Sequence, residues 1–256
     1  ENAKMRLLKN YHWHFPDSNI SKILNRIIII NGDISKFRLG LDQSDWENLC
    51  ATIDGVYHCA ANVRHLGITE TYTYNKYLGT ENIIEFCKHR KPKILNFMST
   101  VAVMGLIKKS SNNTEDIFTE ENLNIQQYFI DPYSESKYKA ELKVQEFIAA
   151  GGEANVFRIG TIGASSLTGI FQKNIHENYF TRLINSIINL KMAPYLPNYN
   201  QDYLPVDIVS NSIISLSLLR TNRTYHIYNS NTFSLYEMCL MLQAIAYQVN
   251  LVYYKN

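Results

Sequence analysis

The sequence predicts an α/β fold in which a doubly wound parallel sheet carries helices on its faces. Short β-branched apolar runs alternate with longer helical patterns along the 256 residues, and small or polar residues follow directly after several of these runs. Strands that alternate with helices imply right-handed βαβ units, and therefore a parallel sheet. A chain of this length can bury a full core as one such domain, so we expect a Rossmann-like architecture.

The elements are predicted in chain order. A helix over residues 1–15 ends before Pro16, and a buried strand over residues 26–30 leads into a turn at Gly32-Asp33. Further helices are predicted at residues 45–52, 70–89, 133–150, 175–190, 207–219 and 234–248, and further strands at residues 56–58, 94–98, 154–157 and 225–228. Residues 101–131 are long, polar and irregular, which is typical of a functional loop.

Composition narrows the class of protein. The formal net charge is only +2, so nothing in the charge balance calls for a nucleic-acid partner. The four cysteines form no C-x-x-C and the seven histidines no H-E-x-x-H, which predicts neither a metal site nor a disulfide framework and fits a reducing cytoplasm. No apolar run approaches the roughly 20 residues of a membrane span, and no signal peptide is visible.

The central chemical motif is Tyr133 with Lys137, four residues later on one face of the same predicted helix. A phenol has an ordinary pKa of about 10, and a neighbouring ammonium is expected to lower it so that the phenol can exchange a proton. Thr100 ends an apolar strand and could offer a hydroxyl to the same substrate oxygen. The same spacing recurs at Tyr72 and Lys76 without such a strand before it, where it indicates an ordinary helix surface.

Four strand ends carry residues suited to a dinucleotide, because ligands of parallel sheets bind beyond the carboxyl ends of the strands. Each of these segments could also be an ordinary turn or a packing contact. Their order along the chain favours a binding site. They are Asp33-Ile34 (a carboxylate and flat backbone for an adenine ring), Cys59-Ala60-Ala61 (small side chains), Ser99-Thr100, and Gly160-Thr161-Ile162 (room beside a ring).

These stretches resemble the extended short-chain dehydrogenase/reductases, and within them the thioester reductase group. That group includes terminal reductase domains of nonribosomal peptide synthetases and the carboxylic acid and aminoadipate reductases. The most discriminating stretch is Leu39-Gly40-Leu41 with Trp46, since nucleotide-sugar epimerases generally lack it. The others are Gly32-Asp33-Ile34-Ser35, Tyr57 to Val63, Asn75 with Gly79-Thr80, Met98 to Thr100, Tyr133 to Lys137, Arg158 to Ile162, and Val206-Asp207.

The resemblance implies a role for each matching residue. Thr100, Tyr133 and Lys137 correspond to the catalytic trio. The implied cofactor-binding residues are Arg6, Asp33, Ile34, Cys59, Ala60, Ala61, Asn75, Ser99, Tyr133, Lys137, Gly160, Thr161 and Ile162. Arg6 would meet the NADPH 2′-phosphate, and an equally good alternative is a solvated helix residue. Asn75 would brace the active site.

The same resemblance implies the domain plan. Residues 1–165 would form the NADP-binding core, and residues 166–256 a substrate-binding and C-terminal region interleaved with the last strands of the sheet. No Gly-rich phosphate loop precedes residue 32, and the arginine expected after the second strand is also missing. We therefore expect the first βαβ part of the fold to lie upstream of Glu1.

The implied activity is NADPH-dependent release of a carrier-protein-bound acyl or peptidyl thioester as an aldehyde, with onward reduction to the alcohol left open. The partner would be a phosphopantetheine-bearing carrier protein, with no nucleic acid and no membrane. Residues 101–131 and 163–200 would wall the acyl channel, with His176 structural. Two alternatives stay open: another extended family member that acts on a nucleotide sugar or small carbonyl, and a non-catalytic docking module.

Overall fold

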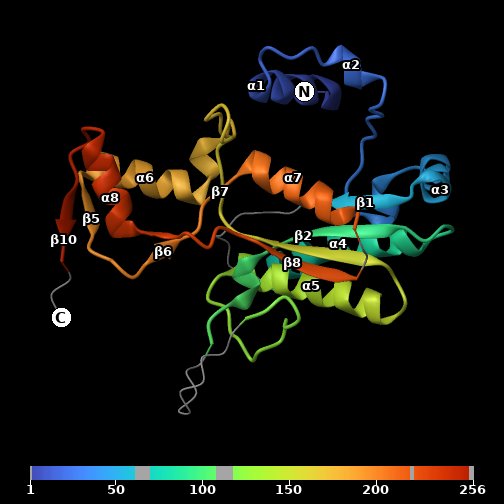
Figure 1. The fold of residues 1–256 in the computed structure, drawn as a ribbon. Helices are drawn as coiled ribbons and strands as arrows, with labels where there is room; N and C mark the ends of the chain where they lie inside the picture. The colour runs from blue at the N-terminus through green and yellow to red at the C-terminus, as the bar shows by residue number, and fades with distance from the viewer. Residues whose placement is uncertain (1, 61–69, 108–117, 220–221, 254–256) are drawn as a thin grey trace. The chain divides into compact units, whose positions relative to one another are not determined.

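The computed structural model describes residues 2–60, 70–107, 118–219 and 222–253, with only the helical backbone described over residues 70–77 (Figure 1). The chain divides into two compact units. One, here called the sheet unit, comprises Ile28–Gly160 and Ser210–Ile227; the other, the second unit, comprises Glu1–Ile27, Thr161–Val209 and Tyr228–Asn256. The predicted division near residue 165 stays a prediction.

The sheet unit is built on four parallel strands in the order β1-β2-β3-β8. Their bounds are β1 (Gly55–His58), β2 (Ile94–Thr100), β3 (Ala154–Ile159) and β8 (Arg223–Ile227). In the central pair, Ser99 lies opposite Arg158 and Thr100 opposite Ile159. Because the strands are parallel, their carboxyl ends share one edge, which is where the predicted site residues were placed. The predicted parallel α/β fold is confirmed.

The helices of the sheet unit are α3 (Gln43–Thr52), α4 (Glu70–Lys88) and α5 (Pro132–Ala149), with 3-10 turns η1 (Phe37–Gly40) and η2 (Val101–Met104). Helices α4 and α5 cover the same side of the sheet (Figure 1). Phe97 of β2 is 1% exposed there and packs with apolar side chains of both helices. The rest of this core is Ile83, Ile84, Cys87, Leu95, Ala140, Val144, Phe147, Ala154 and Val156.

The start of α5 is set by its cap, and this positions Tyr133. The Asp131 carboxylate accepts from the Ser134 backbone N–H at 2.9 Å, which satisfies one of the unpaired donors of the first turn. Pro132 takes the first helical position, where its missing N–H removes no helical bond. Tyr133 therefore lies in the first turn, close to the strand edge, as the sequence predicts.

The predicted strand over residues 26–30 is wrong. These residues belong to no strand, and Ile28 is 88% exposed. A β-branched run becomes a strand only when a neighbour takes its backbone hydrogen bonds, and no described segment pairs with it. The turn that follows is present, since the Lys36 N–H donates to the Asp33 carbonyl at 3.0 Å and the Asp33 N–H to that of Leu39 at 2.7 Å.

The second unit combines helices with small sheets that the sequence did not predict. Its helices are α1 (Ala3–His14), α2 (Ser21–Leu24), the 3-10 turn η3 (Ile175–Glu177), α6 (Tyr179–Leu190) and α8 (Leu235–Ala244), and α7 (Val206–Ser217) starts in it. Its strands pair as β4 (Ile162–Gly163) with β7 (Leu204–Pro205), β5 (Met192–Pro194) with β10 (Asn250–Val252), and β6 (Asn200–Gln201) with β9 (Phe233–Ser234). Apolar side chains of α6 and α8 form its core.

Among the helices that the structure describes, none is both long and apolar enough to span a bilayer. Over the same residues, no group of three or more His, Cys, Asp or Glu side chains is placed to hold a metal ion.

Candidate active site

The structure brings Thr100 and Tyr133 together at the carboxyl edge of the sheet. Thr100 is the last residue of β2, and its side chain forms a hydrogen bond with the phenol of Tyr133. Its Oγ1 also accepts from the backbone N–H of Ala102 at 3.2 Å, which holds the hydroxyl in place. Two hydroxyls from different elements thus converge where a carbonyl oxygen could accept from both.

Lys137 lies one helical turn after Tyr133 and is attached to the same strand. Its Nζ donates to the carbonyl oxygen of Met98 at 2.7 Å and lies 5.2 Å from the ring centroid of Phe97. An ammonium carries three donors, and one is used on Met98. All three residues of the predicted trio are therefore held by β2 and α5.

The predicted electrostatics of the trio are corrected by the structure. Burial raises the pKa of Tyr133, opposed by its hydrogen bond with Thr100, because the phenolate loses hydration. Burial also lowers the pKa of Lys137 to about 8; the nearby Cys59, where its thiol is ionised, and the Glu141 carboxylate oppose this change. The expected lowering of the Tyr133 pKa by Lys137 is wrong here, because burial of the phenol is the largest effect on that pKa and raises it. Tyr133 is consequently a protonated donor at neutral pH.

A buried polar network behind the trio was missed from the sequence. The Ser99 hydroxyl donates to Glu141 Oε2 at 2.6 Å, while Arg158 donates from Nε to Glu141 Oε1 at 2.9 Å and places Nη2 2.8 Å from the same oxygen. Glu141 is 0% exposed and Arg158 1%. One signal was available: Glu141 follows Lys137 by the same four residues that separate Lys137 from Tyr133. The cofactor contact of Ser99 stays a prediction, since its hydroxyl is committed to Glu141.

Beyond β1, Cys59 and Ala60 are exposed at the edge of the sheet, while Ala61 lies outside the described residues. His58 is buried and its Nε2 lies 3.1 Å from the hydroxyl of Thr80. Although Cys59 is exposed as a residue, desolvation of its thiol raises the pKa of that thiol, and the Lys137 ammonium opposes the change. The β1 edge and Lys137 therefore face a common space.

The Asp33–Ile34 turn is braced by α4. Asp33 Oδ1 accepts from Ser35 through its N–H at 3.0 Å and its hydroxyl at 2.6 Å, and these bonds lower the pKa of the exposed Asp33 carboxyl. Asn82 of α4 donates to the Ile34 carbonyl at 2.8 Å. Gly79 leaves room for the Ile34 side chain there, because a Cβ at this position would lie 2.7 Å from Ile34 Cδ1. Asn82 was not predicted; an amide following Gly79-Thr80 on the helix was the available signal.

The remaining predicted cofactor residues are distributed over both units. Gly160 donates its N–H to the Ile227 carbonyl at 2.9 Å in the sheet unit. In the second unit, Asp202 accepts from the Thr161 N–H and hydroxyl at 3.0 Å each, Ile162 is 39% exposed in β4, and Arg6 is exposed on α1. The side chain of Asn75, on α4, lies outside the described residues. Their contacts with a cofactor stay predictions.

The described edge fits a nicotinamide dinucleotide. Small exposed residues at Cys59 and Ala60 allow a flat ligand to approach the backbone. Asp33 presents an ionised carboxylate at an exposed turn, suited to hydroxyl or amino donors of a nucleoside. Lys137 places an ammonium beside the trio, a donor of the kind that hydroxyl groups accept from.

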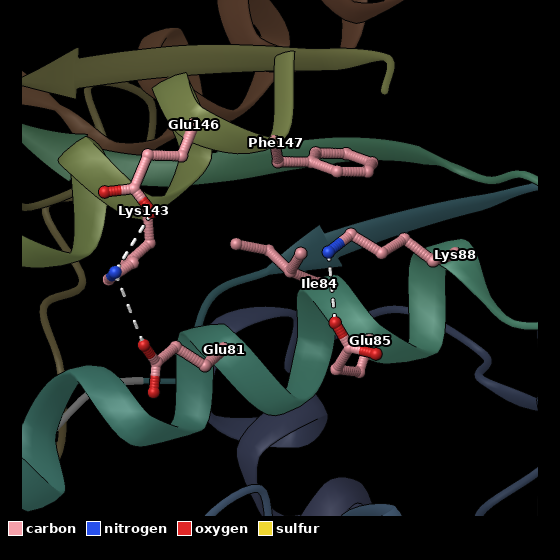
Figure 2. A pocket seen from close by; sticks show the side chains of 7 residues that line it. All are labelled: Glu81, Ile84, Glu85, Lys88, Lys143, Glu146 and Phe147. Atoms are coloured by element: carbon pink, nitrogen blue, oxygen red, sulfur yellow. Dashed lines mark hydrogen bonds and ion pairs between the residues drawn. The ribbon is translucent and has the colours of Figure 1, made fainter. Parts of the chain in front are cut away.

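A separate groove lies between α4 and α5 (Figure 2). Lys143 reaches Glu146 at 3.0 Å and Glu81 at 3.8 Å, and Lys88 pairs with Glu85 at 3.0 Å. Its residues on α5 follow Tyr133 by ten or more positions, which at 1.5 Å per residue places them at least about 15 Å along the helix from Tyr133. Its cations are paired within the groove, so we assign it no part in the site.

Comparison with known sequences shows what this chain is similar to. A family model described as "Male sterility protein" matches residues 1–213. A linear gramicidin synthase protein of Brevibacillus parabrevis is 29% identical over 209 residues, which cover 81% of this chain and 4% of that protein.

Two solved structures share the fold at similar identity. The terminal R domain of the myxalamid PKS-NRPS pathway superposes with a TM-score of 0.86 at 27% identity, covering 97% of this chain and 62% of that one. A thiolation-reductase di-domain of an archaeal non-ribosomal peptide synthetase gives 0.84 at 25% identity, covering 98% and 53%. The chain thus spans less than two thirds of each of these relatives.

Proposed function

The chain belongs to the male sterility protein family, in the thioester reductase group of the extended short-chain dehydrogenase/reductases, and we propose that it reduces a carrier-protein-bound acyl or peptidyl thioester with NADPH, releasing an aldehyde. The observation that carries the proposal is the Thr100–Tyr133 hydrogen bond beside Lys137. Two hydroxyls that converge on one point beside an ammonium suit a carbonyl that becomes an oxyanion.

A nicotinamide cofactor, when bound, supplies the hydride for the thioester carbonyl carbon. We assign its binding to the exposed edge formed by the Asp33–Ile34 turn, by Cys59 and Ala60 beyond β1, and by Lys137. The ionised Asp33 would accept from nucleoside donors, and Lys137 would donate to ribose hydroxyls while one of its N–H groups stays on Met98.

Tyr133 is the proposed proton donor to the carbonyl oxygen. Its raised pKa keeps the phenol protonated at neutral pH, and Thr100 donates a second hydrogen bond to the same oxygen. As negative charge develops on that oxygen, the proton passes from the Tyr133 oxygen to it. The resulting thiohemiacetal loses its hydroxyl proton as its C–S bond breaks, which gives the aldehyde, and the departing sulfur takes up that proton and leaves as the free thiol.

A phosphopantetheine-bearing carrier protein is the proposed partner. Two similar proteins support it: one relative is part of a gramicidin synthase, and one structural neighbour joins a thiolation to a reductase domain. A pantetheine thioester also supplies both the reacting carbonyl and the thiol leaving group.

The test is a substrate comparison on the purified protein. We expect NADPH consumption with an acyl-phosphopantetheine thioester, with free thiol formed in equal amount, and no consumption with a nucleotide sugar. Aldehyde trapping with a hydrazine identifies the first product. Consumption only with the nucleotide sugar would overturn the thioester assignment, and thiol release without NADPH oxidation would indicate hydrolysis.

A further inference from the structure

Three side chains on one stripe of α5 contact three consecutive residues of β2. Tyr133 bonds to Thr100, Lys137 donates to the Met98 carbonyl, and Glu141 accepts from the Ser99 hydroxyl. The four-residue spacing keeps the three helix positions on one face. The Glu141 contact differs from the other two in being fully buried.

From this arrangement we propose that Glu141 is a positioning residue of the site: it seats α5 on β2 so that Tyr133 meets Thr100, and it supplies the negative charge that faces Lys137. This inference rests on the proposed function, because Glu141 would position the side chains that carry out the proposed reaction. Glu141 bonds to Ser99 and Arg158, and it acts on the reaction through Ser99 and through the charge of Lys137.

Arg158 holds the Glu141 carboxylate in a fixed position between α5 and β2. It lies opposite Ser99 on the neighbouring strand, and its Nε and Nη2 both contact Glu141 Oε1 while Ser99 occupies Oε2. A carboxylate held on both oxygens from two strands has one orientation. Its helix therefore has one register on the sheet.

The same arginine reaches the segment that leads back to α5. Arg158 Nη1 donates to the Thr119 carbonyl at 2.9 Å and lies 3.0 Å from His226 Nε2, and the Arg158 guanidinium carbon is 4.5 Å from the ring centroid of Phe118. The Glu141–Arg158 pair thus connects α5, three strands and residues 118–119. An ion pair that served only the fold would have no effect on a lysine of the site, whereas the charge of Glu141 acts on Lys137.

The charged and titratable groups that face Lys137 come from two elements. Cys59 and His58 stand on the β1 side, and Tyr133 and Glu141 share its helix. Glu141 is the carboxylate among them, and its charge raises the pKa of Lys137 against the effect of burial. Without the Glu141 charge, burial should lower the pKa of Lys137 further.

The experiment is Glu141→Gln, which keeps the shape and removes the charge. The pKa of Lys137 is measured by competitive acetic anhydride labelling across pH, followed by mass spectrometry of the peptide that contains it. We expect it to fall below its value of about 8, with the alkaline limb of kcat moving by the same amount and KM for the thioester changing less than kcat. The matched control is Glu146→Gln on the exposed side of α5, where neither value should move.

Loss of one partner of a buried pair can unfold a protein, so a second variant replaces both. Glu141→Leu with Arg158→Met exchanges the pair for apolar groups, a change that folded proteins often tolerate. If this double variant folds and keeps the wild-type Lys137 pKa and kcat, Glu141 is only structural and the proposal is wrong. A lowered Lys137 pKa supports it. Because labelling needs no turnover, this result stands apart from failure of the thioester assay, which would overturn only the proposed function.

Discussion

The Lys137 ammonium lies 2.7 Å from the carbonyl oxygen of Met98, on the strand that ends in Thr100. The lysine is therefore part of the joint between α5 and β2 as well as part of the proposed reaction. A hydrogen bond that involves a charged group contributes about 1.5–3 kcal/mol to stability. The bond to Met98 also fixes where the remaining N–H donors of the Lys137 ammonium lie at the carboxyl ends of the strands.

Replacement of Lys137 should affect both stability and turnover. In Lys137→Met we expect kcat to fall by about 10²-fold or more. We expect the free energy of unfolding to fall by about 1–3 kcal/mol, because the Met98 carbonyl loses its partner. Lys139→Met is the control, since Lys139 makes only an exposed pair with Glu135 and such pairs contribute at most about 1 kcal/mol. Urea titrations and steady-state kinetics check both; an unchanged kcat would remove Lys137 from the mechanism.

Activity and stability should diverge at alkaline pH. The pKa of Lys137 is about 8 in the folded protein against 10.5 ordinarily. Between these values the unfolded chain binds more protons, so the contribution of Lys137 to unfolding free energy rises with pH from about 8 to 10.5. Over the same range the ammonium is lost and kcat should fall. The check is the difference in unfolding free energy between wild type and Lys137→Met across pH; a difference that declines through this range would contradict the assigned pKa.

Asp33 should affect cofactor affinity more than folding. Its carboxyl is exposed and is held ionised by Ser35. In Asp33→Asn we expect the Kd for NADPH to rise by about 10-fold or more, since a charge-assisted hydrogen bond is lost. Asp45→Asn, at an exposed position in the first turn of α3, is the control. Calorimetric titration measures both affinities, and equal Kd values for the two variants would exclude Asp33 from the cofactor site.

The effect of Gly79→Ala should change sign with its neighbour. In the wild-type background the new Cβ would lie 2.7 Å from Ile34 Cδ1 and 3.0 Å from Cγ1, so we expect a loss of about 1–3 kcal/mol. In an Ile34→Ala background both atoms are gone, and the helix propensity of alanine should give a gain of about 0.5–1 kcal/mol. Denaturant unfolding of the wild type, the two single variants and the double variant measures both changes. The same sign in both backgrounds would mean that Gly79 does not support the turn.

Local patterns predicted what local physics determines. The helix that begins near Tyr133, the strand that ends at Thr100 and the parallel sheet all followed from periodicity and turn residues. The strand over residues 26–30 failed because pairing with a neighbour, which a single run cannot report, decides whether β-branched residues form a strand. The raised Tyr133 pKa was missed because it depends on burial of the phenol, which a local sequence pattern does not report.

Contacts between distant residues lay beyond the sequence. The Glu141–Arg158 pair joins a helix to a strand, and Asp202 meets Thr161 across 41 positions. Nothing in either segment indicates its partner. The predicted roles of Arg6 and Asn75 stay predictions, since each depends on placement relative to a cofactor.

The most direct test of the account is aldehyde formation from an acyl-phosphopantetheine thioester by Tyr133→Phe beside Tyr138→Phe. Both tyrosines lie on α5, but Tyr138 packs on Phe129 at a ring-centroid distance of 5.1 Å. We expect the rate to fall by about 10²–10⁴-fold in Tyr133→Phe and to stay near wild type in Tyr138→Phe, with both variants folded and binding NADPH. A wild-type rate in Tyr133→Phe would contradict the assignment of Tyr133 as the proton donor.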